Sequence, residues 1–235
     1  MPDPVINSTT FIDYLTSGSA LIASLVALYG INTWRREYVG KKRMDLGHDL
    51  LEAFYKAKDA IRYIRSPFTP EIERSEAIKD LPEHRNEFDE RAAVLSKRLN
   101  DKQKEIAAFR AMKYKIMAVF GNDSEKIFDE FASIPNQIAT AMGILVKHYW
   151  NRQGENFRNK TEFENHLNEM NRFEGIIWDG TSEGDEILEK LNNIQSALEA
   201  IVHDHQDPIF KRIPKNLYAW IVGRLKNFIQ TIIGQ

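Results

Sequence analysis

The sequence predicts an all-α protein in which one N-terminal transmembrane helix is followed by a cytoplasmic antiparallel helical bundle with one long coiled-coil-like helix. Two observations lead to this prediction. An uncharged run from Tyr14 to Trp34 is long enough, at about 1.5 Å per helical residue, to cross roughly 30 Å of hydrocarbon. Beyond it, apolar residues recur at spacings of three and four, and no strand pattern is found.

Composition limits the class of protein. The chain has 235 residues, of which 43% are hydrophobic and 28% charged, and its negative mean hydropathy excludes a multi-pass transporter. A formal net charge of −2 argues against a dedicated nucleic-acid binder, so no direct nucleic-acid binding is expected. The absence of cysteine removes disulfides and thiolate chemistry and is compatible with a reducing compartment.

Charge on either side of the span predicts its orientation. Residues 1–13 contain acids but no base, and form a short extracytoplasmic N-terminus in this interpretation. Basic residues follow the span at once, which places the C-terminal side in the cytoplasm of a single-pass protein of the cell inner membrane. These topology-determining residues are Arg35, Arg36, Lys41, Lys42 and Arg43.

Small residues line one face of the span. Ser19, Ala23, Ala27 and Gly30 follow one another at spacings of four, four and three, which permits close approach of a second helix. Self-association into a homo-oligomer is one interpretation of this membrane packing face. The other is that Ala and Ser are simply frequent in membrane spans.

Residues 35–205 are predicted to form the bundle. The first helix, with apolar residues from Leu46 to Ile64, ends at Ser66-Pro67, and the segment 68–82 is expected to be an exposed connection. The longest periodic stretch, 83–120, predicts the coiled-coil-like helix, although Lys102 and Lys113 interrupt its apolar positions.

Turn and cap residues predict the later helices. Gly121 is expected to end the long helix, and Ser124 to open the next one, with a kink at Pro135. Thr161 and Glu164 form a capping-box pattern at the start of a helix that runs to Trp178. A final bundle helix is expected from the periodic residues Ile187, Leu191, Ile194, Leu198 and Ile201.

Residues 206–235 are predicted to form a basic amphipathic C-terminal helix. Lys211, Arg212 and Lys215 precede the periodic part. Two placements are open: the helix lies in an anionic membrane surface, or it covers the core of the bundle. Its apolar face includes Leu217, Ile221, Leu225, Phe228 and Ile232.

Several short segments occur in an order that resembles an uncharacterised family of bacterial single-pass membrane-anchored helical proteins. The resemblance covers roughly residues 15–205, and its most specific piece is Ile64-Arg65-Ser66-Pro67. It implies topology only and transfers no catalytic residue. The other matching segments are Trp34-Arg35-Arg36-Glu37, Phe54 to Ile61, Met117 to Gly121, and Ile177-Trp178.

Patterns that would carry chemistry are few and weak. His203-Asp204 with His205 and Asp207 could suggest a metal site or the His-Asp pair of HD phosphohydrolases, but the spacing supplies no further ligands. Arg43 and His48 are separated by four residues, as are the arginine and histidine of the helical HEPN ribonucleases. A chain of this composition is expected to contain about one such pair by chance. We therefore predict no catalytic residue, no metal ligand and no cofactor.

Two charged groups are interpreted structurally. Arg62 and Arg65 are expected to form ion pairs within the bundle. An acidic stretch is expected to be a solvated loop, with binding of cations or of a basic partner as the alternative. Its members are Glu71, Glu73, Glu76, Asp80 and Glu83.

The function expected from these features is that of a membrane-anchored helical interaction protein. It would act by partner binding and oligomerisation as a membrane-acting effector or sensor of a phage-defence or toxin-type system. Its partners would be membrane lipid, further copies of the chain and an unknown cytoplasmic protein. The alternatives are a membrane-tethered nuclease or phosphohydrolase of the HEPN-like or HD-like kind, and a passive membrane scaffold.

Overall fold

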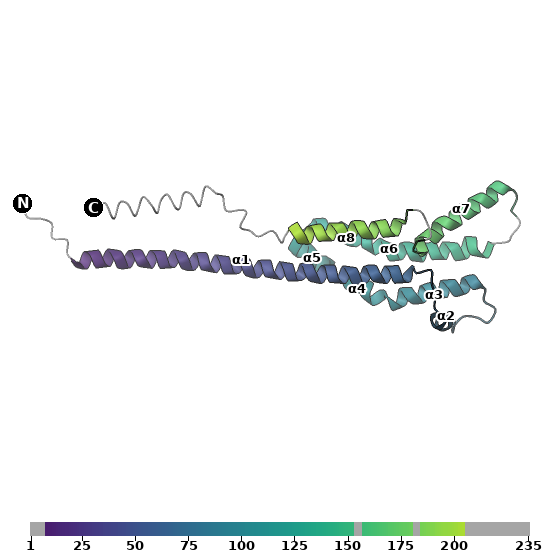
Figure 1. The fold of residues 1–235 in the computed structure, drawn as a ribbon, viewed down its shortest axis with the longest axis horizontal. Coiled ribbons are helices and arrows are strands. Elements are labelled where there is room, and N and C mark those ends of the chain that lie inside the picture. Colours follow the sequence, from purple (N-terminus) through teal and green to yellow (C-terminus); the bar gives the residue numbers. More distant parts are fainter. Residues whose placement is uncertain (1–7, 153–156, 181–183, 205–235) are drawn as a thin grey trace, which may run out of the picture.

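A computed structural model describes residues 8–152, 157–180 and 184–204. All regular elements in these ranges are helices, which confirms the predicted all-α class. Helix α1 (Ser8–Ile64) is the longest element; the other helices lie along its second half, and some of them continue beyond its C-terminal end (Figure 1). The α-helices that follow are α2 (Glu71–Ala77), α3 (Glu87–Asp101), α4 (Gln103–Ala111), α5 (Lys113–Phe120), α6 (Glu125–Ile144), α7 (Lys160–Ile177) and α8 (Glu186–Asp204).

The first bundle helix is continuous with the segment predicted to span the membrane. Both lie in α1, which has 57 residues and passes through Gly40 and Gly47 without interruption. Gly47 has a packing role, because a Cβ atom there would lie 3.0 Å from Cγ1 of Val202 on α8. The glycine lets α8 approach α1 closely where the bundle begins.

The prediction of one long helix over 83–120 is wrong. The stretch forms α3, α4 and α5, with breaks at Lys102 and Met112. In one straight helix, Lys102 and Lys113 would occupy positions that face the core. In the structure Lys113 lies 2.6 Å from Asp129 and Lys102 lies 3.6 Å from Glu105, so neither ammonium is without a carboxylate partner.

Two local predictions also need correction. The connection 68–82 contains the short helix α2. Helix α7 is capped by Asn159, whose side chain accepts a hydrogen bond from the backbone N–H of Glu162 at 2.8 Å, so Thr161 is not the cap. The end of α5 at Gly121, with φ of 101°, is as predicted, and α6 begins directly after Ser124.

The end of α6 departs from α-helical geometry. Helix α6 continues through Pro135, and a π-helical turn, η2 (Leu145–Tyr149), follows it, with a 3-10 turn, η3 (Trp150–Arg152), after that. An earlier 3-10 turn, η1 (Asn122–Ser124), links α5 to α6. The π-helical turn lies against α7.

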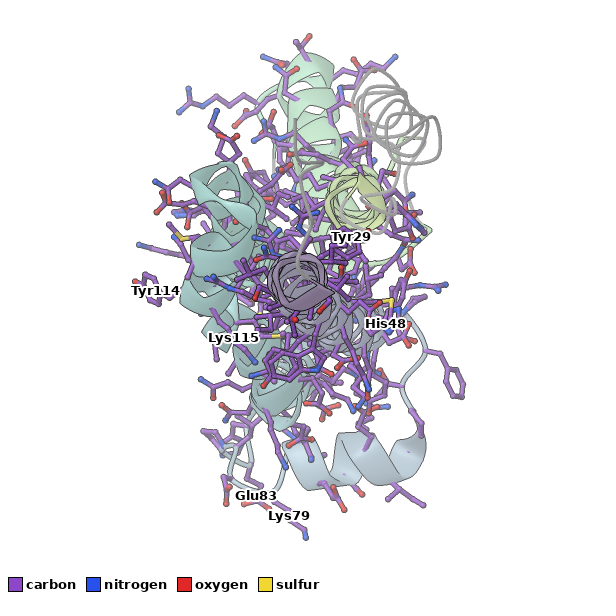
Figure 2. The ribbon with its side chains drawn as sticks, turned by 90° about the vertical axis from the view of Figure 1, so that its left-hand side faces the viewer. Tyr29, His48, Lys79, Glu83, Tyr114 and Lys115 are labelled. Atoms are coloured by element: carbon purple, nitrogen blue, oxygen red, sulfur yellow. The ribbon has the colours of Figure 1, made fainter. Side chains whose placement is uncertain are left out.

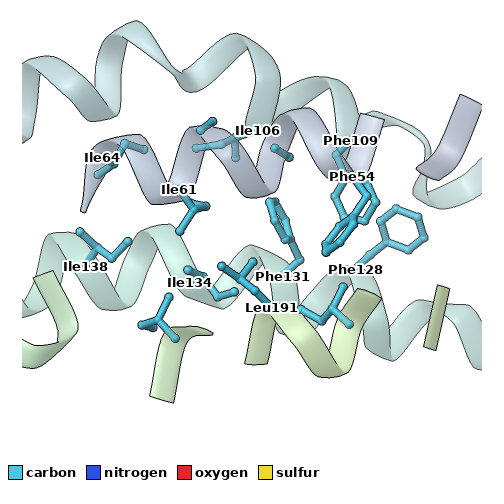
Figure 3. Packing of buried hydrophobic residues seen from close by; sticks show 14 of the residues in the cluster. Phe54, Ile61, Ile64, Ile106, Phe109, Phe128, Phe131, Ile134, Ile138 and Leu191 are labelled. Atoms are coloured by element: carbon cyan, nitrogen blue, oxygen red, sulfur yellow. The ribbon is translucent and has the colours of Figure 1, made fainter. Parts of the chain in front are cut away.

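Aromatic rings form the centre of the core. Phe109 on α4 stacks on Phe128 at 4.9 Å between ring centroids and meets Phe131 edge-on at 4.7 Å, and Phe54 of α1 packs on the same cluster (Figure 3). Helices α1, α4, α6 and α8 thus share one hydrophobic core. Replacing one such buried ring by Ala typically costs about 3–5 kcal/mol.

Candidate membrane and assembly surface

The N-terminal half of α1 extends beyond the bundle. Among the α1 side chains that the structure describes, Leu46 is the first buried one, whereas large apolar residues before it are exposed, with 63% of Ile22 and 67% of Trp34 accessible. Apart from the helix itself, nothing lies within 4 Å of a Cβ atom built on Gly30 or Gly40. We call residues 22–44 the arm (Figure 1). Figure 2 views the molecule along α1 from its N-terminal end, with Tyr29 labelled beside the helix.

Large apolar side chains are exposed along the whole arm, with no described element against them. Contiguous exposed apolar surface on a soluble protein marks a contact with another protein or with a membrane. The other large exposed apolar side chains of the arm are Val26, Leu28, Tyr29, Ile31, Tyr38, Val39 and Met44.

Basic and aromatic residues meet at the end of the arm nearest the bundle. The rings of Trp34 and Tyr38 stack at 5.9 Å, and Nζ of Lys42 lies 4.6 Å from the centre of the Tyr38 ring. All five predicted topology-determining residues are exposed there, and we call them the basic collar (Arg35, Arg36, Lys41, Lys42 and Arg43). The collar thus separates the apolar part of the arm from the bundle.

Two serines of the predicted span satisfy their hydroxyls within the helix. Ser19 Oγ donates to the carbonyl of Thr16 at 2.9 Å, and Ser24 Oγ donates to the carbonyl of Ala20 at 2.8 Å. Such bonds lower the cost of placing a hydroxyl in an apolar medium. Even so, among the residues that the structure describes, no helix combines the length and the apolar composition required of a membrane span, and the span over 14–34 stays a prediction.

The predicted packing face lies in the same part of α1. The structure leaves Ser19, Ala23, Ala27 and Gly30 exposed, with no other described element against them. Their availability to a second helix is therefore compatible with the structure, and self-association stays a prediction.

A buried arginine ties the far end of α1 to α7 and α8. Arg65, only 1% exposed, donates to the carbonyls of Gly175 and Ile176 at 2.9 Å and to that of Trp178 at 3.0 Å. Its guanidinium also lies 2.9 Å from the Asp185 carboxylate. Burial alone would raise the pKa of Asp185, but Arg65 and the N–H of Leu188 outweigh it and hold the pKa below its usual value.

A second buried arginine ties α3 to the turn after α1. Arg98 forms an ion pair with Glu73 of α2 at 2.7 Å and donates to the carbonyl of Phe68 at 2.7 Å. The Arg98 guanidinium lowers the pKa of Glu73. We call the two groups together the arginine clamps; they enclose Ser66-Pro67, the turn that ends α1.

The contacts of the arginine clamps can be compared with the predictions made for the charged residues. The ion pair expected for Arg65 is confirmed, and that of Arg62 with Asp179 is longer, at 3.8 Å. The acidic stretch is not wholly a solvated loop, because Glu73 is largely buried against Arg98. Sequence reasoning missed Arg98 and Asp185; the one available signal was that Arg98 lies between Leu95 and Leu99, within an apolar periodic stretch.

Among the residues that the structure describes, the weak patterns considered for an enzyme are not brought together. Arg43 and His48 are exposed on α1, and His203 is exposed on α8, whereas His205, Asp207 and the amphipathic tail lie outside the described residues. Within the described ranges, no three His, Asp or Glu side chains are placed to hold a metal ion.

Comparison of the chain with family models, with curated proteins and with solved structures gives no match. The functional interpretation therefore depends on the geometry of this chain alone.

Proposed function

We propose that this protein is a non-enzymatic, membrane-anchored helical interaction protein in which residues 14–34 insert in the inner membrane and the bundle remains on the cytoplasmic side. The observation that carries the proposal is the arm itself. It presents large apolar side chains that no described element covers, and it ends in the basic collar next to the bundle.

The chemistry of the arm supports a bilayer as its environment. Trp34 and Tyr38 have the amphipathic rings that prefer the headgroup region, and the collar that follows suits anionic cytoplasmic headgroups. The internal hydrogen bonds of Ser19 and Ser24 reduce the polarity that the helix presents. Association of several arms through the small-residue face would shield the remaining polar groups from lipid.

Because the chain has no native cysteine, single cysteines can test the topology cleanly. Ser8→Cys places a thiol before the predicted span, and Tyr114→Cys places one on the bundle, where Tyr114 is 78% exposed (Figure 2). In intact spheroplasts, a membrane-impermeant maleimide should label the first variant only. Labelling of the bundle variant alone, or of both to the same degree, would contradict the proposed orientation.

The same approach tests self-association. Ala23→Cys lies on the small-residue face. In the matched control, Leu28→Cys, the cysteine is five residues further along the helix, which at about 100° per residue turns it about 140° away from Ala23. Mild oxidation in membranes should cross-link the Ala23 variant several-fold more than the control. Equal cross-linking of the two would mean that this face does not mediate assembly.

We further propose that the bundle acts as an effector or sensor, in a phage-defence or toxin-type setting, that perturbs the membrane when a cytoplasmic partner releases it. Overexpression should then depolarise cells and arrest growth, and deletion of residues 1–34 should abolish both effects. If the full-length chain is not toxic and always co-purifies with one partner, the result would support a passive scaffold instead.

A further inference from the structure

Basic side chains gather in a groove at the end of the molecule opposite the N-terminus of α1, where α7 lies beside the end of α6 (Figure 1). The groove has a volume of about 430 Å³. Two turns, η2 and η3, form one side, and α7 forms the other. The lining residues are Lys147, His148, Tyr149, Asn151, Arg152 and His166.

Two basic side chains of this groove, Lys147 and His148, have no carboxylate partner in the described structure. Within the described chain, Lys147 and His148 form no ion pair or side-chain hydrogen bond, in contrast to Lys113 and Lys190, whose ammonium groups bind carboxylates. Arg152 binds Glu162 of α7 at 3.1 Å. The pKa of Glu162 is lowered by a hydrogen bond from the N–H of Arg158 and by Arg152, so this carboxylate remains ionised and balances one cation only.

A buried histidine supplies a second, independent observation. His166 is 8% exposed, and its Nε2 atom is buried without a hydrogen-bond partner in the described structure. Its ring packs between Tyr149, at 5.2 Å, and Phe157, at 5.1 Å. A buried polar atom left without a partner costs about 1–3 kcal/mol, and such atoms in native proteins often correspond to a missing ligand or water.

The backbone geometry presents these side chains together. Lys147 and His148 lie in the π-helical turn η2, and π-helical turns occur frequently at functional sites. Asn151 is held by a hydrogen bond from its amide to the carbonyl of Val146 at 2.9 Å, which fixes the turn that carries Arg152.

We propose that this groove binds a small phosphate-bearing solute. Lys147 and Arg152 supply the positive charge that phosphate oxygens require, His148 and Asn151 supply further polar groups, and the same two cations disfavour a metal ion. The volume admits more than one phosphate group. This site is independent of how α1 is anchored, since it lies at the other end of the molecule.

The test is calorimetric titration of the full-length protein in mild detergent with inorganic pyrophosphate. We expect saturable binding with one site per chain. The double variant Lys147→Gln/His148→Gln should weaken binding at least tenfold, and the matched control Lys126→Gln, an exposed lysine at the other end of α6, should leave it within twofold. Citrate at the same ionic strength should bind at least tenfold more weakly than pyrophosphate.

Absence of saturable binding to the native chain would overturn the proposal, as would equal affinities of the native chain and the double variant. An equal loss in the Lys126 control would mean non-specific attraction and would also overturn it. Equal binding of citrate would refute the preference for phosphate. Each protein is first checked for native helical content by circular dichroism, and the Lys147 and His148 substitutions are at exposed positions that do not endanger the fold.

Discussion

Replacing Arg65 by Ala should destabilise the bundle far more than replacing its neighbour Arg62. Arg65 is buried, bonds three carbonyl groups at the end of α7 and pairs with Asp185. Its removal leaves a buried carboxylate without its counter-charge and several carbonyls without their donor. Breaking a buried ion pair from one side costs about 3–5 kcal/mol, a large part of the roughly 5–15 kcal/mol that stabilises a typical domain.

Arg62 is the matched control for this experiment. Its side chain is 59% exposed and lies 3.8 Å from Asp179, so Arg62→Ala should cost about 0–1 kcal/mol. Urea unfolding of the full chain in mild detergent, followed by far-UV circular dichroism, measures both free energies of unfolding. A cost below about 1 kcal/mol for Arg65→Ala, or equal costs for the two variants, would refute the reasoning that the clamp holds α7 and α8 on α1.

Acid should weaken both arginine clamps. The pKa values of Glu73 and Asp185 are lowered in the folded protein. Their ionised forms therefore stabilise the fold above the unfolded-state pKa of about 4, and this stabilisation is lost as the pH falls below that value. Urea midpoints measured between pH 7 and pH 3 should fall, and Glu73→Gln should flatten that fall; an unchanged slope would contradict the assignment. Gly47→Leu should cost about 1–3 kcal/mol by thermal melting, because the new side chain meets Val202, whereas Gly40→Leu, where nothing lies within 4 Å, should not destabilise.

Much of the helical pattern could be predicted from the sequence because it depends on local chemistry. Leu50, Ile61 and Leu191 follow the three/four periodicity, and all three are buried. Gly121 ends α5 with a positive φ, as expected for a residue without a side chain. Such signals depend on neighbours a few residues apart and need no knowledge of tertiary contacts.

Features that depend on distant contacts could not be predicted. Lys102 and Lys113 were recognised as interruptions of the apolar positions, but the breaks at Lys102 and Met112 were not predicted. Likewise, Arg98 binds the turn after α1, about 30 residues away, and its burial follows from that contact. The continuity of α1 from the predicted span into the bundle was also missed, because the two segments were treated as separate elements.

The candidate surfaces, too, could be predicted from the sequence only in part. Exposure of the collar and of the small-residue face agrees with the sequence patterns. The basic groove beside His166 was not foreseen, because its residues are ordinary in sequence and are brought together only by the π-helical turn and α7.

Alkaline carbonate extraction of membranes tests the anchoring role of the arm most directly. The native chain should remain in the membrane pellet. Ile22→Arg/Val26→Arg should move it to the supernatant, because each arginine near the centre of a span costs about 2.5–3.5 kcal/mol. The control Val39→Arg/Met44→Arg, on the same helix within or beyond the collar, should stay in the pellet. Extraction of the native chain, or the same partition for both double variants, would contradict membrane insertion of the arm.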